Sequence, residues 1–315
     1  MDREGHPPSC RSSERQALWQ NDRMNSAPDI LRLTAFASTP DGGNPAGLVL
    51  DASGLTDEQM QDIAAEVGYA ESAFVVRPGS AEEPGRIGIR YFSPTAEVPF
   101  CGHATVATAV ALADRGIARD FVFETPAGEV RITTSDSAAG TMATFTSVAP
   151  QVAPIAPEVL ARLLDLLGLE EPDLHPEYPV RLSFAGNVHP VLVLAGQTVF
   201  DDFRFDPAAM RELMDEQGWK GTVTVLSVRS ASEFEARNLF PVGIITEDPA
   251  TGSAAASVGA YLRELQLVQV PGRVLIHQGR HVGRPSLLTV DVPAEGGIRV
   301  SGTAAIIQGP QQPAT

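Results

Sequence analysis

The spacing of apolar residues along the chain predicts many strands and a few helices. Residues 56–67 place apolar side chains on one helical face, with Thr56 as a potential N-cap and Gln59 three residues on. Two small, apolar helices are predicted over about 106–115 and 252–265. Strands are predicted over 30–36, 48–50, 72–76, 86–92, 121–125, 129–133, 223–229, 234–239, 274–278 and 286–292, with a glycine-rich turn over 41–47.

The order of these elements occurs twice. Each copy contains a strand, a proline-containing turn, an X-Gly-X-Ala string, a small helix, a strand, a turn and a strand. Gly102 and Gly252 hold equivalent places 150 residues apart, near half the length of the chain. Chance can produce one such match, because strand-turn-helix segments are common, but the shared order of elements favours two homologous halves.

The repeat and the length predict the domain organisation. A chain of 315 residues exceeds the roughly 100–200 residues of an ordinary domain. The proline-rich segment 150–157 is the candidate linker. We therefore expect a disordered leader (1–28, in which Met24 is an alternative start), an N-terminal half (29–149), a C-terminal half (150–307) and a tail (308–315).

Composition excludes several classes of function. The chain has 23 Lys and Arg against 39 Asp and Glu, a net charge of −16, and no basic run. Nucleic acids and anionic membranes are therefore poor partners. Cys10 and Cys101 are too few for a disulfide framework, and the leader lacks the apolar stretch of a signal peptide. No apolar stretch reaches the length of a membrane span, so we expect a cytoplasmic protein.

The two small helices offer a binding site at their N-termini. Unpaired N–H groups and a partial positive charge favour anions there, and a glycine allows close approach to the backbone. If the helix starts at Gly102 and Gly252 face one cleft, they form a cradle for a carboxylate. The alternative is that both glycines only permit tight packing of helix on strand.

Titratable residues stand next to these helix starts and at the junction before strand 72–76, and they have structural alternatives. A helix N-terminus can activate Cys101, but thiolate–imidazole pairs usually come from separate segments and His103 is only two residues away. A buried inert thiol is the alternative. Glu71 precedes an apolar strand, where partial burial would raise its pKa, or it is a solvated carboxylate. Asp248, together with Glu247, could simply favour the dipole of the second helix.

Metal binding is not predicted. His277 and His281 are four residues apart, but their segment is strand and turn, so they would not share a helical face. Phosphate-binding loops with lysine, dinucleotide-binding glycine patterns and Gly-X-Ser-X-Gly elbows are also missing from the sequence.

Four strings in order resemble the PhzF family of phenazine-biosynthesis-like proteins. They are Gly-Asn-Pro-Ala-Gly (43–47), Ala-Glu-Ser-Ala-Phe-Val (70–75), the strings at 92–98 and 101–105, and Glu-Asp-Pro-Ala-Thr-Gly-Ser-Ala (247–254). The resemblance runs from about residue 30 to residue 307. It implies an α+β, diaminopimelate-epimerase-like fold, in which two pseudo-symmetric domains each wrap a curved, mostly antiparallel sheet around a central helix.

The resemblance also implies an activity and a site. The namesake of the family isomerises trans-2,3-dihydro-3-hydroxyanthranilate by moving a proton. Members are commonly homodimers and use no cofactor. The implied catalytic residues are Glu71, His103, Asp248 and Ser253. We expect contacts with a small carboxylate-bearing substrate from Asn44, Cys101, Gly102, Thr251 and Gly252.

The two helix starts differ in a way that bears on mechanism. Related epimerases use one cysteine at each helix start, whereas this chain has Cys101 at the first and Thr251 at the second. This difference favours a proton shift by one base, Glu71, over a two-thiol reaction. A non-catalytic dimeric metabolite-binding protein and a Cys101-dependent epimerase or hydrolase stay open. The substrate is not readable; His175, Tyr178, Asn187 and His189 are possible pocket or surface residues.

Overall fold

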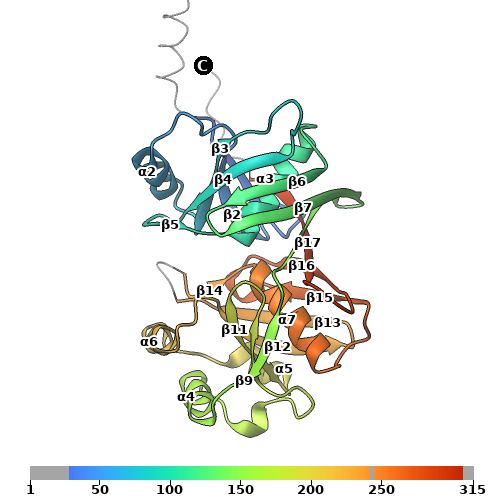
Figure 1. Ribbon diagram of the computed structural model, residues 1–315. Coiled ribbons are helices and arrows are strands. Elements are labelled where there is room, and N and C mark those ends of the chain that lie inside the picture. Colours follow the sequence, from blue (N-terminus) through green and yellow to red (C-terminus); the bar gives the residue numbers. More distant parts are fainter. Residues whose placement is uncertain (1–27, 242–244, 308–315) are drawn as a thin grey trace, which may run out of the picture.

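The computed structural model describes residues 28–241 and 245–307. The predicted leader, apart from Pro28, and the predicted tail lie outside these residues. Figure 1 shows two lobes. The upper lobe in this view is formed mainly by the first half of the chain, and the lower lobe mainly by the second half. None of the helices described is long and apolar enough to cross a membrane.

Strands dominate both lobes. The first part of the chain contains β1 (Leu31–Ala35), β2 (Asn44–Val49), α2 (Asp57–Val67), β3 (Glu71–Arg77), β4 (Arg86–Phe92), β5 (Glu97–Val98), α3 (Gly102–Asp114), β6 (Asp120–Thr125), β7 (Gly128–Ser137) and β8 (Gly140–Thr146). The second part contains β9 (Gln151–Pro154), α4 (Pro157–Leu167), η1 (Glu171–Asp173), β10 (Arg181–Phe184), β11 (Val188–Leu194), α5 (Gln197–Asp202), α6 (Pro207–Gln217), β12 (Val223–Ser230), β13 (Glu233–Leu239), β14 (Glu247–Asp248), α7 (Gly252–Glu264), β15 (Gly272–Gln278), η2 (Arg280–Val282), β16 (Ser286–Val292) and β17 (Arg299–Ile306).

Eight strands close a barrel in the upper lobe. Neighbours follow the order β1, β2, β3, β4, β6, β7, β8 and β17, and β17 pairs again with β1. The β2–β3 and β4–β6 pairs are parallel and the others are antiparallel. Helix α3 lies inside the barrel, with every side chain from His103 to Ala113 buried. An all-round apolar helix is what such a position requires.

The lower lobe repeats this arrangement. Strands β10, β11, β12, β13, β15 and β16 follow one another with the same alternation of parallel and antiparallel pairs, around the buried helix α7. Strand β8 pairs with β17, β9 pairs with β10, and β17 also pairs with β16. The predicted α+β fold of two pseudo-symmetric halves around central helices is confirmed. The residue at which one half ends stays a prediction.

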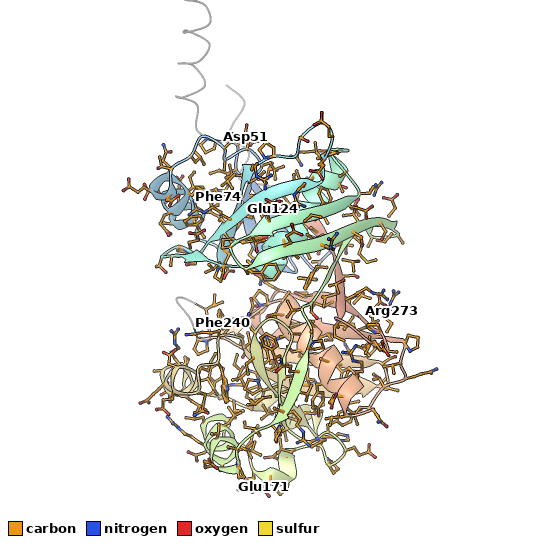
Figure 2. The ribbon with its side chains drawn as sticks, viewed as in Figure 1. Asp51, Phe74, Glu124, Glu171, Phe240 and Arg273 are labelled. Atoms are coloured by element: carbon orange, nitrogen blue, oxygen red, sulfur yellow. The ribbon has the colours of Figure 1, made fainter. Side chains whose placement is uncertain are left out.

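The local sequence explains the ends of α2. Thr56 and Gln59 form a reciprocal capping box at its N-terminus, as predicted, and Gly68 ends the helix in the left-handed region at φ 70°. Figure 2 shows Phe74 of β3 near this helix; its ring is fully buried and meets Phe92 edge to face at 5.4 Å. The capping residues thus set the ends of α2, and packing against Phe74 and Phe92 attaches the helix to the barrel wall.

The glycine-rich segment 41–47 is a turn, as predicted, only over 41–43, and from residue 44 on it belongs to a strand. Strand β2 begins at Asn44 and pairs with β1 on one side and β3 on the other. A Cβ at Gly47 would lie 2.7 Å from Ser72 Oγ, so only glycine fits this strand position. A composition typical of turns arises here from close packing inside a sheet.

The segment 150–157 is more than a linker. Its residues Gln151–Pro154 form β9, which pairs with β10 in the lower lobe. The elements that follow, from α4 to α6, are ones that the sequence analysis does not assign. Their apolar faces build a second core in the lower lobe, which includes Leu163, Phe200 and Met210.

Candidate active site

A cavity of about 680 Å³ lies between the two lobes and takes its walls from both. Figure 2 shows one wall residue, Phe240, on the side of the lower lobe that faces the upper lobe. Eight of the nine residues predicted for the site line the cavity: Glu71, Cys101, Gly102, His103, Asp248, Thr251, Gly252 and Ser253. The ninth, Asn44, contacts one of them.

The two helix N-termini meet at this cavity. A Cβ at Gly102 would lie only 3.8 Å from the Cα of Gly252, so the first turns of α3 and α7 face each other closely. Neither N-cap residue, Cys101 or Thr251, makes a side-chain cap hydrogen bond. Backbone N–H groups of both first turns are therefore available to an anion between them.

Glu71 begins β3 and directs its carboxyl group toward the start of α3. Its Oε2 lies 3.6 Å from Nε2 of His103 and 3.7 Å from Sγ of Cys101. The side chain retains only 20% of its exposure. Burial, and next the negative charge of Asp248, raise the pKa of Glu71 to about 7. This carboxyl group can therefore gain and lose a proton near neutral pH.

His103 is a neutral imidazole in this site. Burial lowers its pKa to about 4, and a hydrogen bond with the backbone of Pro45 offsets part of that effect. The 3.6 Å approach to Glu71 is thus a contact between a neutral ring and a carboxyl group. The neutral ring donates its single N–H to the backbone of Pro45, so it adds no positive charge beside Glu71 and its other nitrogen is an acceptor.

Cys101 and His103 are in contact, contrary to the expectation from their spacing. The Sγ atom lies 3.3 Å from Nδ1 of His103. The N-cap residue and the second residue of the helix both face the cavity, so separate segments are not needed. Burial, followed by the charge of Glu71, raises the pKa of the Cys101 thiol, so the thiol form dominates.

Asp248 is anchored from both lobes. Nδ2 of Asn44 donates to Oδ1 of Asp248 at 2.6 Å and to the carbonyl oxygen of Ala250 at 3.0 Å. The Thr251 hydroxyl donates to Oδ2, and Gln278 donates to the Asp248 carbonyl oxygen. Burial raises the pKa of Asp248 to about 6, although the bonds from Thr251 and Asn44 act against it.

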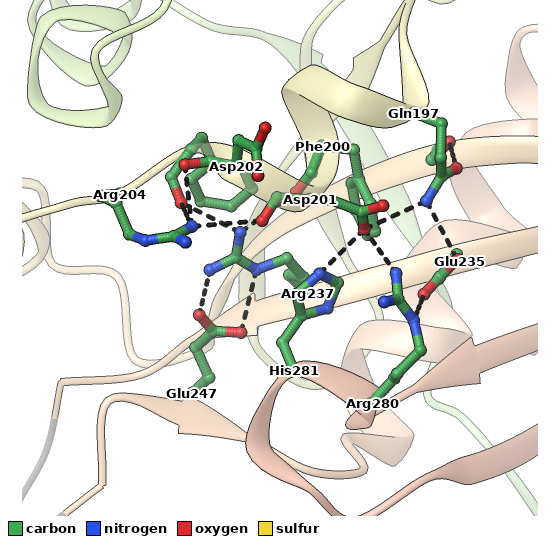
Figure 3. A network of polar contacts seen from close by, with 12 residues as sticks. Gln197, Phe200, Asp201, Asp202, Arg204, Glu235, Arg237, Glu247, Arg280 and His281 are labelled. Carbon is green, nitrogen blue, oxygen red and sulfur yellow. Dashed lines mark hydrogen bonds and ion pairs between the residues drawn. The ribbon is translucent and has the colours of Figure 1, made fainter.

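Neither Asp248 nor Glu247 caps α7, although both precede the helix whose dipole they were expected to favour. Thr251 is the N-cap of α7, and Glu247 instead forms a buried ion pair with Arg237. Figure 3 shows Arg237 between Glu247 and α5, where it also donates to the carbonyl oxygens of Phe200 and Phe203. This network ties β14, and with it Asp248, to the body of the lower lobe.

Strand registers identify equivalent residues in the two lobes. Val98 and Asp248 pair with equivalent strands, and each stands four residues before its helix. Counted along the same registers, Glu71 corresponds to Thr222. The other equivalent pairs are Cys101 with Thr251, His103 with Ser253 and Ala46 with His189. The position that Glu71 occupies in the upper lobe is thus taken by a threonine in the lower lobe.

The sequence analysis missed or left open four polar groups of the lower lobe in the cavity wall, which are Asn187, His189, Lys220 and Thr222. Asn187 and His189 were left open as pocket or surface residues, and Lys220 and Thr222 carried no motif. Their one available signal is the register of β11 and β12 against β2 and β3, which needs the strand pairing to be known.

Two groups of side chains have the spacing of a metal site in the described residues. Glu71, Cys101 and His103 form the first, and Asp201, Glu235 and His281 the second. In the second group Arg280 pairs with both carboxylates and fills the space between them (Figure 3). In the first, burial favours protons on the thiol and the carboxyl group, whereas metal ligands are deprotonated. Both arrangements are better suited to proton and ion-pair chemistry.

Known proteins resemble this chain over most of its length. The family model of the phenazine biosynthesis-like proteins, PhzC-PhzF, matches residues 33–309. An uncharacterised isomerase of Escherichia coli O157:H7, YddE, is 32% identical over 290 residues, which cover 89% of this chain and 96% of the relative. A trans-2,3-dihydro-3-hydroxyanthranilate isomerase of Pseudomonas chlororaphis is 28% identical over 257 residues, covering 81% and 87% of the two chains.

Solved structures agree with the architecture. A phenazine biosynthesis protein of the PhzF family from Bacillus anthracis superposes with a TM-score of 0.76 at 28% identity, covering 89% of this chain and 96% of the other. A probable proline racemase from Agrobacterium radiobacter K84 gives a TM-score of 0.57 at 12% identity, covering 90% and 93%. The second likeness concerns the fold alone, and it agrees with the epimerase-like fold that the resemblance implied.

Proposed function

The chain belongs to the PhzC-PhzF family of phenazine biosynthesis-like proteins, and on that premise we propose that it is an isomerase. In this proposal it moves a proton on a small, carboxylate-bearing substrate without a cofactor. Glu71 takes the proton from one carbon and returns it to another. The observation that carries the proposal is a single carboxyl group with a pKa of about 7 in the wall of an interlobe cavity.

The surroundings of Glu71 support this role. A base with a pKa near the working pH is present in both protonation states, so it can accept a proton and give it back. When Glu71 removes the proton, the electron pair of the C–H bond spreads into the unsaturated system of the substrate. Protonated Glu71 then delivers the proton to a second carbon. This proton shift needs no oxidant or reductant.

Other groups are suited to hold the substrate. The N-termini of α3 and α7 can bind its carboxylate, because their N–H groups converge on one space. The Ser253 hydroxyl can stabilise negative charge as it develops, and neutral His103 lies beside Glu71, with its Nε2 3.6 Å from Oε2. Asp248 is placed to bind a substrate amine, since Asn44 and Thr251 hold its carboxyl group in one orientation.

The substrate class follows from these groups and from one relative. A carboxylate cradle beside an acidic group fits an amino acid-like compound. The Pseudomonas chlororaphis relative is named for trans-2,3-dihydro-3-hydroxyanthranilate. We propose a cyclic amino acid-like substrate of this kind, with the identity of the compound left to the experiment.

Deuterium incorporation tests the proposal. The protein is incubated in D₂O with trans-2,3-dihydro-3-hydroxyanthranilate and related cyclic amino acids, and exchange and products are followed by NMR. The expected result is isomerisation with exchange, reduced roughly 10²–10⁴-fold by Glu71→Gln, the usual contribution of one acid/base group. Glu66→Gln, on the exposed side of α2, is the matched control. Full activity of Glu71→Gln would refute the role of Glu71, and binding without turnover would favour a metabolite-binding protein.

A Cys101-dependent epimerase is the second candidate, because Cys101 lines the cavity and contacts His103 at 3.3 Å. The raised pKa of the thiol and the threonine at the equivalent position oppose it. We therefore expect Cys101→Ala to retain exchange and iodoacetamide to block it only by filling the site. Loss of exchange in Cys101→Ala would instead favour the thiol mechanism.

Assembly and location are also proposals. The family resemblance and the acidic, cysteine-poor sequence support a cytoplasmic homodimer. Light scattering during size-exclusion chromatography should then give twice the mass of the 33.3 kDa chain.

A further inference from the structure

His189 is a fully buried histidine in the wall of the cavity. It lies on β11 with 0% exposure. Its Nε2 lies 3.1 Å from Oγ of Ser253, in the first turn of α7. Its Nδ1 lies 3.0 Å from the backbone nitrogen of Thr222. The equivalent residue of the upper lobe is Ala46, so this imidazole has no counterpart there.

The backbone of Thr222 determines which nitrogen of His189 carries the proton. The N–H of Thr222 donates to Nδ1, and within residues 28–241 and 245–307 it has no other acceptor. If Nδ1 were protonated and donated to the Thr222 carbonyl oxygen, which also lies at 3.0 Å, this buried N–H would be left without a partner. Burial keeps the ring neutral by lowering its pKa to about 4. The proton therefore belongs on Nε2.

The tautomer has a consequence for Ser253. With a proton on Nε2, the imidazole donates to Oγ of Ser253 at 3.1 Å. The hydroxyl hydrogen of Ser253 cannot point back at His189, and Oγ has no other partner among the described residues. It must point into the cavity that Ser253 lines. This is the reverse of a nucleophilic serine, in which histidine accepts the hydroxyl proton.

The chain keeps the ring in this place by close packing. A Cβ at Gly221 would lie 2.5 Å from Cε1 and 2.7 Å from Nε2 of His189, so the backbone between Lys220 and Thr222 lies directly against the imidazole. The Thr222 hydroxyl donates to Asn238, and its oxygen lies 3.1 Å from Nδ1 of His189. A protonated Nδ1 could donate to this oxygen in place of the carbonyl oxygen, but the Thr222 N–H would again be left without an acceptor. The ring is thus held on two sides.

We infer that His189 is a positioning residue that fixes the Ser253 hydroxyl as a hydrogen-bond donor to an anionic oxygen of the ligand. The Ser253 hydroxyl and the N–H groups of α7 then supply only hydrogen-bond donors. A ligand that fits them carries an anionic acceptor, such as a carboxylate or an enolate-like oxygen. This inference deepens the proposed function and rests on it for the identity of the ligand. The tautomer itself does not depend on turnover.

The first test reads the tautomer by NMR without any substrate. The full-length protein, labelled with ¹⁵N-histidine, is examined by long-range ¹H–¹⁵N correlation at pH 7, and His189 is assigned from the signals lost in His189→Gln. The expected pattern is a protonated Nε2 and an unprotonated Nδ1. A protonated Nδ1 would overturn the inference, whatever the activity of the protein.

The second test measures binding of anthranilate, a planar carboxylate probe, to the unmodified protein and to four variants. Ser253→Ala and His189→Leu should each weaken binding by roughly tenfold, the usual effect of losing one hydrogen bond to a charged group. The double variant should bind like Ser253→Ala, because His189 acts through the hydroxyl. His189→Gln, which can still donate, should recover most of the affinity.

Controls separate positioning from folding. Circular dichroism and the unfolding midpoint report whether each variant folds, and His175→Gln, a histidine outside the cavity wall, should bind as the unmodified protein does. If His189→Leu weakens binding equally with and without Ser253, the histidine acts independently of the hydroxyl and the inference fails. If Nε2 of His189 is protonated and the double variant binds like Ser253→Ala, but no substrate exchanges, the proposed function is contradicted and the inference stands.

Discussion

At the scale of single residues, the site depends on which groups burial leaves uncharged. Glu71 and Asp248 share one cavity, and burial together with their mutual repulsion raises the pKa of Glu71. Burial lowers the pKa values of His103 and His189. At neutral pH the wall thus holds one carboxyl group close to half protonation, beside two neutral imidazoles. This is a suitable arrangement for moving a proton and a poor one for generating a thiolate at Cys101.

The pKa of Glu71 makes a prediction about stability. Because it rises from 4.5 to about 7 on folding, its contribution to folding is full below about pH 4.5 and is lost as the pH rises through 7. Relative to Glu71→Gln, the unmodified protein should lose about 2–3 kcal/mol of unfolding free energy between pH 5 and pH 8. Denaturant unfolding of both proteins at the two pH values checks this.

The histidines provide the control for that experiment. Their lowered pKa values reduce stability as the pH falls from 6.5 toward 4, which is the direction opposite to that of Glu71. Titration of the histidines therefore cannot imitate the loss of stability between pH 5 and pH 8 that is predicted for Glu71. An unchanged difference between pH 5 and pH 8 would show that Glu71 has an ordinary pKa and would remove the main support for its acid/base role.

At the scale of elements, the site residues lie on the short strand β14, at the start of β3 and at the N-termini of α3 and α7. Strand β14 is only Glu247–Asp248, too short to hold its place by pairing alone. The buried ion pair between Arg237 of β13 and Glu247 fixes the position of β14. Asn44 at the start of β2 reaches across from the other lobe to the same strand. The position of Asp248 thus depends on contacts from outside its own segment.

Replacing Arg237 should therefore lower the free energy of unfolding much more than replacing an exposed arginine. Arg237→Met leaves the Glu247 carboxylate buried without a partner, which typically costs about 3–5 kcal/mol. Arg162 pairs with Glu216 at the surface, with 42% and 45% of the two side chains exposed, and Arg162→Ala should cost about 1 kcal/mol or less. Denaturant unfolding compares the two. Equal losses would show that the pair does not anchor β14.

At the scale of the whole molecule, the proposed function requires an acidic protein to admit an anionic ligand. The net charge is −16, and Glu71, Glu129 and Asp248 line the cavity. Lys220, the only lysine in the chain, is the one Lys or Arg among the lining residues that the structure describes. Its side chain is exposed, so we expect it to affect the approach of the proposed ligand more than the chemistry.

Lys220→Ala should raise KM for a carboxylate substrate and leave kcat nearly unchanged, whereas Lys220→Arg should behave like the unmodified protein. The effect should shrink as salt screens the exposed charge. Arg273→Ala, which removes an exposed arginine outside the cavity wall, is the matched control. Steady-state kinetics at low and high ionic strength provide the measurement. A fall in kcat without a change in KM would contradict a role in attracting the substrate.

Much of this protein could be predicted from its amino-acid sequence. The repeated order of elements indicated two similar halves, the capping box at Thr56 located α2, and four strings indicated the family. These features are visible because each depends on neighbours in the chain: hydrophobic periodicity, capping residues and short strings. The predicted site residues also proved to lie together, although their roles stay predictions.

Other features were decided only by the tertiary structure. The segment 41–47 contains the start of a strand because β1 and β3 flank it, and 150–157 contributes a strand because β10 pairs with it. The pKa of Glu71, the contact of Cys101 with His103 and the tautomer of His189 arise from burial and from partners distant in sequence. Such properties depend on which groups share a space from which water is excluded, and a chain specifies that space only once both lobes have closed around it.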